Sequence, residues 1–491
     1  MSTYIKTFIS SILFILLPTI LMQAQVDLRN INFEGKVHDE RRKGIPNVSV
    51  TDGYNIVRTD ANGRYKILSN ATAEYIYISI PSGYEVPMKN DAPLFFHKVP
   101  KEYKEKQIFN FELTKSKKDD NKHVMVVWSD PQVYYEEELT QLQEAVDDLK
   151  NLIAKDYPKT PVFGLVPGDM IGWIKDADKL YPPIKQKIAA TGIPFFYAVG
   201  NHDMDADDRS EFYAKTTYKK YFGPNYYSFN RGRIHYIVLD NVFYTARNNA
   251  SIGYLDDKQM DWLEQDLKTV AEGSTLIITM HIPTFSPDSR RGEPHKDQMH
   301  RVLQNREPLY KLLEPYNVHI FSGHEHYVEN YQLKENLFEH VHTTLSGLFW
   351  MAPWSWDGSP CGYAVYEIDN NDIKWYSKSI GKDKDHQFNA YPIGYNEQKP
   401  NAVTANVWNY DPAWKVYWYE NGVKMGEMEQ FTGYDFSIVD YVNKNQSGFK
   451  HKGIGAAPTE HMFYAVPKST ESSIMIEVID RFSNIYSKIV Q

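Results

Sequence analysis

Between His123 and Tyr376, short apolar runs alternate with segments of helical periodicity, and this alternation constrains the fold more than any other feature. It is typical of an α/β domain. Buried strands are predicted at Val124–Val127, Val162–Val166, Phe195–Val199, Ile234–Leu239, Leu276–Met280 and Val318–Phe321. Apolar stripes at spacings of three and four residues predict two helices, through Leu142, Val146, Leu149 and Ile153 and through Met260, Leu263, Leu267 and Val270.

The flanking segments have β character instead. From Ile31 to Ile80, strand-like pieces are separated by turn sequences, which predicts a small antiparallel sandwich. The charged stretch from Lys115 to Lys122 is predicted to be a solvated linker. After Asp383, a hairpin turn at Asn421-Gly422 and further strand-like runs predict a second β-sandwich. We therefore predict domains at residues 25–120, 121–383 and 384–491. The aromatic residues of the last domain are expected in its core, with glycan binding as the alternative.

The N-terminus predicts export. Lys6 precedes an apolar run from Phe8 to Met22, so residues 1–24 are interpreted as a signal peptide of a periplasmic or extracellular protein. The run is shorter than the roughly 20 residues that span a bilayer, so no stable membrane anchor is expected, although an uncleaved anchor is the alternative. Cys361 is the only cysteine, which excludes an intramolecular disulfide. The net charge of -9 argues against nucleic acid as a partner.

Metal-ligand residue types follow five of the predicted strands. Ligands gather at the carboxyl ends of strands in α/β sheets, so these positions favour a common site. A single histidine there usually has a structural role, but five such segments in one domain indicate a metal site. In extended backbone, Asp130 and Gln132 would point the same way, as would His324 and His326. The segments are Ser129-Asp130-Pro131-Gln132, Gly168-Asp169, Gly200-Asn201-His202-Asp203, Met280-His281 and Gly323-His324-Glu325-His326.

The ordered set resembles the calcineurin-like metallophosphoesterase superfamily, whose blocks run D-x-H, G-D, G-N-H-[DE], H and G-H-x-H. The resemblance implies a four-layer α/β/β/α metallophosphoesterase sandwich. The flanking modules resemble those of a bacterial three-domain subgroup, in which the N-terminal module is similar to carboxypeptidase-regulatory-like sandwiches. Two divalent metal ions are implied, and the donor types suit Mn, Fe or Zn. Asp169 would bridge the ions, with Asp130 and His326 on the first and Asn201, His281 and His324 on the second.

Gln132 departs from the superfamily pattern, which has histidine at this position. Gly172 stands where another variant of the superfamily supplies a tyrosine ligand. Gln132 offers only an amide oxygen, a weaker donor than imidazole, so the first metal site is expected to be the weaker one.

The resemblance also implies a reaction, in which a metal-bound water attacks phosphorus in line. His202 would face the leaving group, and Asp203 would either orient the His202 imidazole or cap its own loop. Trp350, Trp354 and Trp356 lie soon after His326 and are expected to pack in the core or in a lid, with stacking on substrate as the alternative.

Together these features predict an exported metal-dependent phosphoesterase. A secreted glycan- or protein-binding protein with a degenerate structural metal site is the alternative, and Gln132 favours it. A nuclease would share the metal chemistry but needs a basic groove, of which the sequence gives no signal. The class of phosphate ester and the oligomeric state stay open.

Overall fold

The structure is a computed structural model that describes residues 31–490 except 70–71, 103–105, 206–207, 209, 247–249 and 287–297. The predicted signal peptide, residues 1–24, lies outside the described residues. Among the residues described, no helix is long and apolar enough to cross a membrane.

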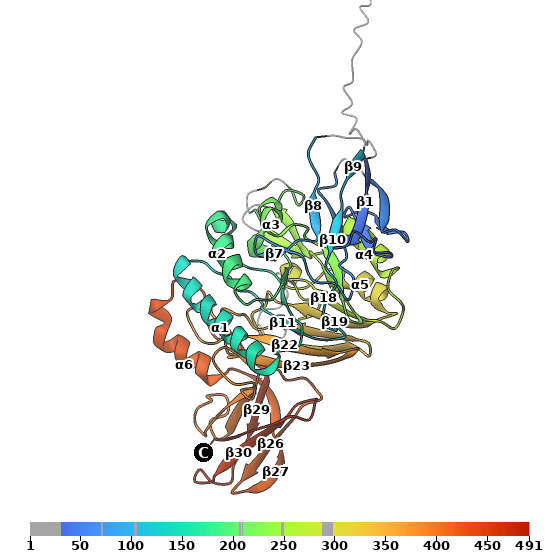
Figure 1. Cartoon of the computed structure of the whole chain (residues 1–491). Helices are drawn as coiled ribbons and strands as arrows, with labels where there is room; N and C mark the ends of the chain where they lie inside the picture. Colours follow the sequence, from blue (N-terminus) through green and yellow to red (C-terminus); the bar gives the residue numbers. More distant parts are fainter. Residues whose placement is uncertain are drawn as a thin grey trace, which may run out of the picture.

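Two sheets packed face to face form the middle of the molecule (Figure 1). The first has the strand order β13-β12-β11-β22-β23, and the second has the order β14-β15-β18-β19-β21-β20. The strands of the first are β11 (Lys122–Val127), β12 (Val162–Val166), β13 (Phe195–Tyr197), β22 (Gly362–Asp369) and β23 (Asp372–Ser379). Those of the second are β14 (Tyr227–Arg231), β15 (Ile234–Val238), β18 (Thr275–Thr279), β19 (Asn317–Ser322), β20 (Glu329–Lys334) and β21 (Leu337–Val341). A separate hairpin pairs β16 (Val242–Ala246) with β17 (Ala250–Gly253).

Helices cover the outer faces of both sheets. One core joins the first sheet to helices α1 (Leu139–Asp156), α2 (Ala177–Ala189) and α3 (Thr216–Phe222). A second core joins the other sheet to α4 (Asp257–Leu267) and α5 (Arg306–Leu313). The α/β/β/α order confirms the predicted fold class. Val270, placed in the second predicted helical stripe, lies beyond the end of α4 but packs against the same core.

Alternate residues in the second part of β11 serve the two cores, which explains the apolar run from Val124 to Val127. Val124 and Val126 pack against the helices, whereas Met125 and Val127 pack between the sheets. Successive side chains of a strand point to opposite faces, so a run that packs against apolar layers on both faces is apolar at every position.

The N-terminal module consists of two small sheets, with strand orders β10-β1-β4 and β3-β2-β5-β8. The first is not purely antiparallel as predicted, because β1 pairs in parallel with β9 and β10. Strands β6 and β7 form a short hairpin. The strands are β1 (Ile31–Asp39), β2 (Ser49–Thr51), β3 (Ile56–Arg58), β4 (Arg64–Ser69), β5 (Tyr75–Ile78), β6 (Met88–Lys89), β7 (Ala92–Pro93), β8 (Phe96–Lys98), β9 (Lys106–Ile108) and β10 (Phe111–Leu113).

This module shares its core with the middle domain. Phe33 and Ile76 belong to the same apolar cluster as Phe229 and Ile277 of the second sheet. The predicted linker is also partly buried: the Asp120 carboxylate accepts a hydrogen bond from the Gly83 backbone at 2.9 Å and lies 3.8 Å from the Arg231 guanidinium. The solvated-linker prediction is therefore wrong at Asp120, because this residue ties the N-terminal module to β14.

The C-terminal module is an antiparallel sandwich with sheet orders β24-β25-β29-β28 and β27-β26-β30-β31. The hairpin predicted at Asn421-Gly422 joins β26 to β27. Helix α6 (Phe436–Asn445) was not predicted. The strands are β24 (Phe388–Tyr391), β25 (Val403–Val407), β26 (Lys415–Glu420), β27 (Val423–Glu427), β28 (Glu429–Gly433), β29 (Thr459–Ala465), β30 (Ile474–Ile479) and β31 (Ile485–Ile489).

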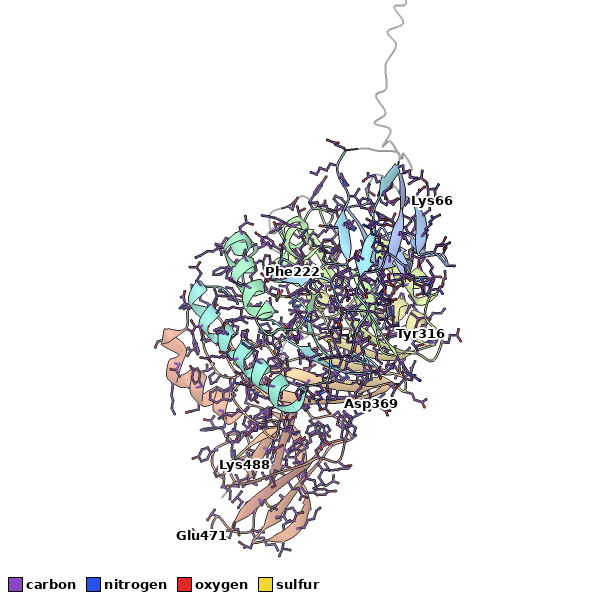
Figure 2. The ribbon with its side chains drawn as sticks, in the orientation of Figure 1. Lys66, Phe222, Tyr316, Asp369, Glu471 and Lys488 are labelled. Atoms are coloured by element: carbon purple, nitrogen blue, oxygen red, sulfur yellow. The ribbon has the colours of Figure 1, made fainter. Side chains whose placement is uncertain are left out.

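The two flanking modules lie at opposite ends of the molecule. Figure 2 shows Lys66 at the N-terminal end and Glu471 at the far tip of the C-terminal module. The C-terminal module nevertheless sends α6 back alongside α1 (Figure 1).

Candidate metal centre

All five predicted ligand segments meet at one edge of the two packed sheets. They follow β11, β12 and β13 of the first sheet and β18 and β19 of the second. Since parallel strands in one sheet end at the same edge, these loops are neighbours in space although almost 200 residues separate the first from the last.

Left-handed backbone, rather than extended backbone, aims the side chains in three of these segments. A positive φ is uncommon outside glycine, and clusters of such residues are typical of functional sites. The prediction relied on the alternation of side chains in extended backbone to place Asp130 beside Gln132 and His324 beside His326. That reason is wrong, because none of the four residues has extended backbone. The residues concerned are Asp130 (φ 46), Gln132 (φ 37), Asp169 (φ 54), His324 (φ 68) and His326 (φ 59).

The residues predicted for the second metal form a compact group around Nε2 of His281. This nitrogen lies 2.9 Å from Oδ1 of Asn201, 3.4 Å from Oδ2 of Asp169 and 3.1 Å from Nδ1 of His324. With metal–ligand bonds of about 2.1 Å, neighbouring ligand atoms lie about 3.0 Å apart in an octahedron and about 3.4 Å apart in a tetrahedron. The observed spacings fit a divalent cation held by these four side chains.

The hydrogen bonds of His281 strengthen this interpretation. Its Nδ1 donates to the Pro167 carbonyl at 2.9 Å, so in the neutral ring Nε2 carries a lone pair. That lone pair faces the oxygens of Asn201 and Asp169, which are acceptors as well. Burial opposes a charge on His281, yet the Asp169 carboxylate prevails and raises the pKa of this histidine to about 9. Without a metal ion the proton on His281 therefore supplies the positive charge that this group favours, and a bound cation would take the place of that proton.

The residues predicted for the first metal are less compact. Nε2 of His326 lies 3.5 Å from Oδ1 of Asp130, and both side chains are buried. Gln132 donates its amide N–H to Oδ2 of Asp169 at 3.0 Å. Among the described residues, the buried Oε1 of Gln132 and Nδ1 of His326 have no hydrogen-bond partner. Buried polar atoms are normally paired, so the unpaired Gln132 oxygen fits the role of a metal ligand.

Two glycines allow the carboxylates to enter the site. A Cβ atom on Gly200 would lie 2.1 Å from Oδ1 of Asp169, and one on Gly323 would lie 2.2 Å from Oδ2 of Asp130. No larger residue fits either position without displacing a predicted ligand.

Asp169 is held from both sides, as a bridging carboxylate would be. Its Oδ1 accepts the backbone N–H of His202 at 2.9 Å, and its Oδ2 faces Gln132 and His281. Burial alone would raise the pKa of Asp169, but the neighbouring His281 and His202 hold it well below its usual range. The carboxylate is therefore ionised and available to cations.

His202 lies beside the ligands, but it is oriented differently from the prediction. Its Nδ1 donates to the Gly172 carbonyl at 2.7 Å, which fixes the ring. The Asp203 carboxylate instead accepts hydrogen bonds from the Gly200 N–H at 2.9 Å and the Tyr181 hydroxyl at 2.8 Å. The prediction that Asp203 orients His202 is thus wrong, and the alternative that it caps its own loop describes the structure. The Asp203 carboxylate does not contact the His202 ring because the Asp203 side chain turns back toward Gly200, at the start of the same turn.

Several supporting residues were not found from the sequence. Ser129 donates to Oδ2 of Asp130, and Tyr181 donates to Asp203 from helix α2. Tyr181 carries no motif of its own. Ser129, in contrast, directly precedes the predicted ligand Asp130, and this adjacency was the only sequence feature that pointed to its supporting role.

The tryptophans after His326 pack rather than project into solvent. Trp350 donates its indole N–H to the Pro131 carbonyl at 2.8 Å and so supports the loop of Asp130 and Gln132. Trp354 packs edge-on against Tyr441 of α6, with ring centroids 5.7 Å apart. Trp350 and Trp354 therefore pack against apolar clusters of the molecule, which agrees with the expected packing role.

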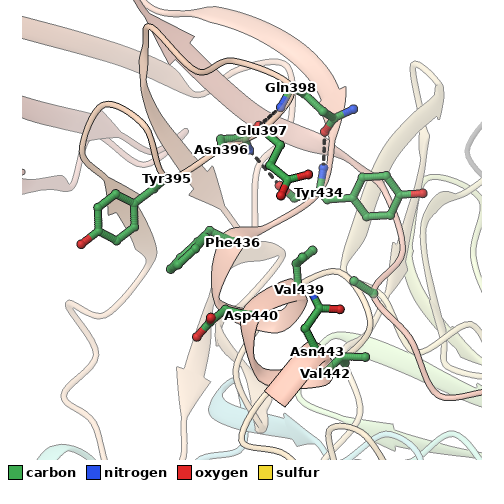
Figure 3. Close-up of a pocket in the computed structure, with 11 residues that line it drawn as sticks. Tyr395, Asn396, Glu397, Gln398, Tyr434, Phe436, Val439, Asp440, Val442 and Asn443 are labelled. Carbon is green, nitrogen blue, oxygen red and sulfur yellow. Dashed lines mark hydrogen bonds between the residues drawn. The ribbon is translucent and has the colours of Figure 1, made fainter. Parts of the chain in front are cut away.

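A hollow of about 370 Å³ lies away from this centre, in the C-terminal module (Figure 3). Exposed Tyr395 and Tyr434 line it, together with Phe436 and Asp440 at the start of α6. It contains none of the predicted ligands. Trp408 and Trp414 of the same module are buried, as the prediction of core aromatics requires.

The fold and the clustered ligand side chains define the class of metal-dependent phosphoric ester hydrolases. Residues 123–328 match the family described as Calcineurin-like phosphoesterase, residues 31–116 match its N-terminal module and residues 339–486 its C-terminal module. The chain therefore belongs to the calcineurin-like phosphoesterase superfamily, in the three-domain form.

Individual relatives are distant. Over 142 residues the chain is 28% identical to purple acid phosphatase 13 of Arabidopsis thaliana, a match that covers 26% of this chain and 24% of that protein. The chain thus spans about a quarter of this curated relative. Among solved structures, it resembles purple acid phosphatase PPD1 of yellow lupin at 14% identity, with a TM-score of 0.39 over 72% of each chain. A dimetal phosphatase of Danio rerio is 12% identical, with a TM-score of 0.36 over 53% of this chain and 97% of that one.

Proposed function

We propose that the protein is an exported hydrolase that cleaves phosphate esters with two divalent cations. The observation that carries this proposal is the convergence of lone-pair atoms from Asp169, Asn201, His281 and His324, with His202 beside them and bonded elsewhere. A structural metal site would need the ligands but not the additional histidine.

The side chains divide into two sets for the two cations. Asp130, His326 and the Gln132 oxygen would hold one, while Asn201, His281 and His324 would hold the other, with Asp169 between them. When bound, the cations would supply Lewis acidity at the phosphoryl oxygens and lower the pKa of water. The imidazole, carboxylate and amide donors suit Mn, Fe or Zn.

His202 would act on the leaving group. Because Nδ1 is engaged by the Gly172 carbonyl, Nε2 is the nitrogen left for the substrate. Donation of a proton from Nε2 requires the doubly protonated ring, because Nδ1 already carries the hydrogen that bonds to Gly172. Its neighbour Asn201 holds metal, so the two residues would perform separate tasks.

Metal-stripped protein reloaded with Mn, Fe or Zn should hydrolyse members of a phosphate monoester and diester panel. Asp169→Asn should lose both bound metal and activity, since the bridging anion is replaced by a neutral amide. Asp178→Asn, at an exposed aspartate on α2, is the matched control and should keep both. A protein that binds two metals in full yet cleaves no member of the panel would instead favour a binding protein with a structural metal site.

Export is part of the proposal and rests on the apolar run from Phe8 to Met22 after Lys6. Fractionation of expressing cells should place the mature chain, beginning near Gln25, outside the cytoplasm. Recovery of the full-length chain in the cytoplasm, or of an intact N-terminus in the membrane, would contradict export without affecting the proposed chemistry.

A further inference from the structure

Aromatic rings from three parts of the chain line the side of the metal centre next to His202. Tyr134 lies at their middle, with its ring centroid 6.3 Å from His202 and 5.6 Å from Phe349. Phe349 in turn lies 5.3 Å from the predicted ligand His326. The rings therefore form a continuous surface between the leaving-group histidine and the first metal site.

The C-terminal module completes this surface with His451. Its ring centroid lies 4.3 Å from Tyr134, 5.2 Å from Phe349 and 6.2 Å from Trp173. The charge of His202 contributes to lowering the pKa of His451, after burial and the adjacent Lys450. His451 is thus an electrostatic neighbour of the site although it is about 250 residues further along the chain. We call Tyr134, Trp173, Phe349 and His451 the aromatic wall.

Contacts close to His451 in the chain fix its position. Lys450 forms an ion pair with Glu137 at 2.8 Å, and its ammonium lies 4.5 Å above the Tyr135 ring. Tyr441 of α6 donates to the Met351 carbonyl at 2.7 Å, and the Ala457 N–H donates to the Trp356 carbonyl at 2.7 Å. The segment is therefore held against the middle domain on both sides of His451.

The aromatic wall is not a closed core. Trp173 is 36% exposed, and His451 is only partly buried. Among the described residues, the buried Nε2 of His451 has no hydrogen-bond partner. Leaving a buried polar atom unpaired costs about 1–3 kcal/mol, so packing alone does not account for a histidine here.

The geometry points to a substrate subsite: the aromatic wall binds a planar ring on the leaving group, and His451 of the C-terminal module is a specificity-determining residue. Aromatic faces and edges favour planar aromatic partners over alkyl groups of the same charge. This inference rests on the proposed function, because it assigns the leaving-group side of that site.

Binding of phosphonates, which are not hydrolysed, tests the subsite without requiring turnover. Titration calorimetry on the metal-loaded protein should show phenylphosphonate binding about tenfold or more tighter than methylphosphonate. His451→Ala should reduce this preference by about three- to tenfold, the usual contribution of one aromatic contact. His451→Phe keeps a ring and should keep the preference, since phenylphosphonate offers no hydrogen-bonding atom on its ring. Lys452→Ala, at the exposed neighbour, is the control and should bind as the wild type does.

Each variant should melt close to the temperature of the wild type, so that a change in binding does not reflect a folding defect. If His451→Ala does fold poorly, His451→Phe still tests the inference. An unchanged preference in His451→Ala, an equal loss in His451→Phe, or no preference in the wild type would each overturn the inference. Phenyl preference in a protein that hydrolyses no phosphate ester would contradict the proposed function and leave the subsite standing. Hydrolysis of methyl phosphate without any preference for phenylphosphonate would contradict the subsite and leave the proposed function standing.

Discussion

At the residue scale, His202 and Asp169 are neighbours with separable roles. Nδ1 of His202 is bonded to a backbone carbonyl, whereas Oδ2 of Asp169 faces the ligand His281 and Oδ1 accepts the backbone N–H of His202. We expect His202→Ala to keep its metal and to lose about 10²- to 10⁴-fold in turnover, the usual contribution of a positioned acid or base. Asp169→Ala should lose metal. Elemental analysis together with steady-state kinetics checks both.

The leaving group offers an internal control for His202. A nitrophenyl ester departs without a proton, so His202→Ala should impair its hydrolysis less than that of an alkyl ester of phosphate. Loss of metal in His202→Ala, or full activity on the alkyl ester, would show that the role assignment is wrong.

Gln132 is predicted to make the first metal site the weaker of the two. Its amide nitrogen is engaged by Asp169, and only the oxygen is left for a cation. Replacement by histidine supplies an imidazole nitrogen, a stronger donor, so Gln132→His should tighten the weaker site in a metal titration. Two equally tight sites in the natural protein, unchanged in the variant, would contradict this prediction.

Residue identities in the site were more predictable than residue roles. The ordered motifs indicated every side chain of the compact group around His281, because ligands must follow strand ends. The role of Asp203 was not predictable, since it depends on a hydrogen bond from Tyr181 of another element. His451 carried no signal, because its place depends on how the C-terminal module docks.

At the scale of elements, Glu339 of β21 links protonation to stability. The carboxyl is fully buried and accepts the Thr284 N–H at 2.7 Å. Burial raises its pKa from 4.5 to about 7, against the opposing hydrogen bonds from Thr284. The native state therefore binds the proton more tightly than the unfolded chain does, so this contribution to stability is present below about pH 4.5 and is lost as pH rises to about 7. Its size is on the order of 3 kcal/mol.

Glu339→Gln mimics the protonated form and should abolish this pH dependence. Melting temperatures of the two proteins should agree near pH 4.5, and the variant should melt several degrees higher at pH 8. A constant difference between the two proteins across this range would contradict the assignment to Glu339.

Strands were predicted well where burial alone decides them. Short apolar runs such as Val162–Val166 are suited to buried strands, and β12 has these bounds. Helix α6 was missed although its signals were present: Asp435 caps the first turn, and Ile438 and Val442 lie four residues apart. The surrounding β pattern outweighed them. Left-handed backbone at Asp130 or His324 leaves no sequence signal, because neither residue is glycine.

At the scale of the whole molecule, a buried polar network joins the C-terminal module to the middle domain. The Asp357 carboxylate accepts the Val328 N–H at 2.9 Å and lies 3.2 Å from Nε2 of His461, while Asn406 donates to the Asp357 carbonyl at 2.9 Å. Asp357→Ala keeps the backbone carbonyl that Asn406 contacts but removes the carboxylate from the Val328 N–H and the His461 ring, at a cost of about 3–5 kcal/mol. The connection near Lys382, which is exposed between β23 and β24, should then be cut faster by trypsin.

Limited proteolysis followed by mass spectrometry checks this prediction, with a C-terminal fragment beginning near residue 383 as the expected product. Asp369→Ala, at an exposed aspartate of β22, is the control. Equal rates of cleavage in the two variants would show that the network does not hold the module in place.

The core shared by the N-terminal module and the second sheet has a consequence for the order of folding. Ribosomes release the N-terminal module first, but the apolar cluster that contains Phe33 and Ile76 is incomplete until Phe229 and Ile277 have been made. At about 5–20 residues per second, the apolar faces of the module stay uncovered for ten seconds or more. This module therefore cannot complete its folding ahead of the rest of the chain, as a tandem domain with its own core would. A nascent chain therefore presents these strands to chaperones until the middle domain follows.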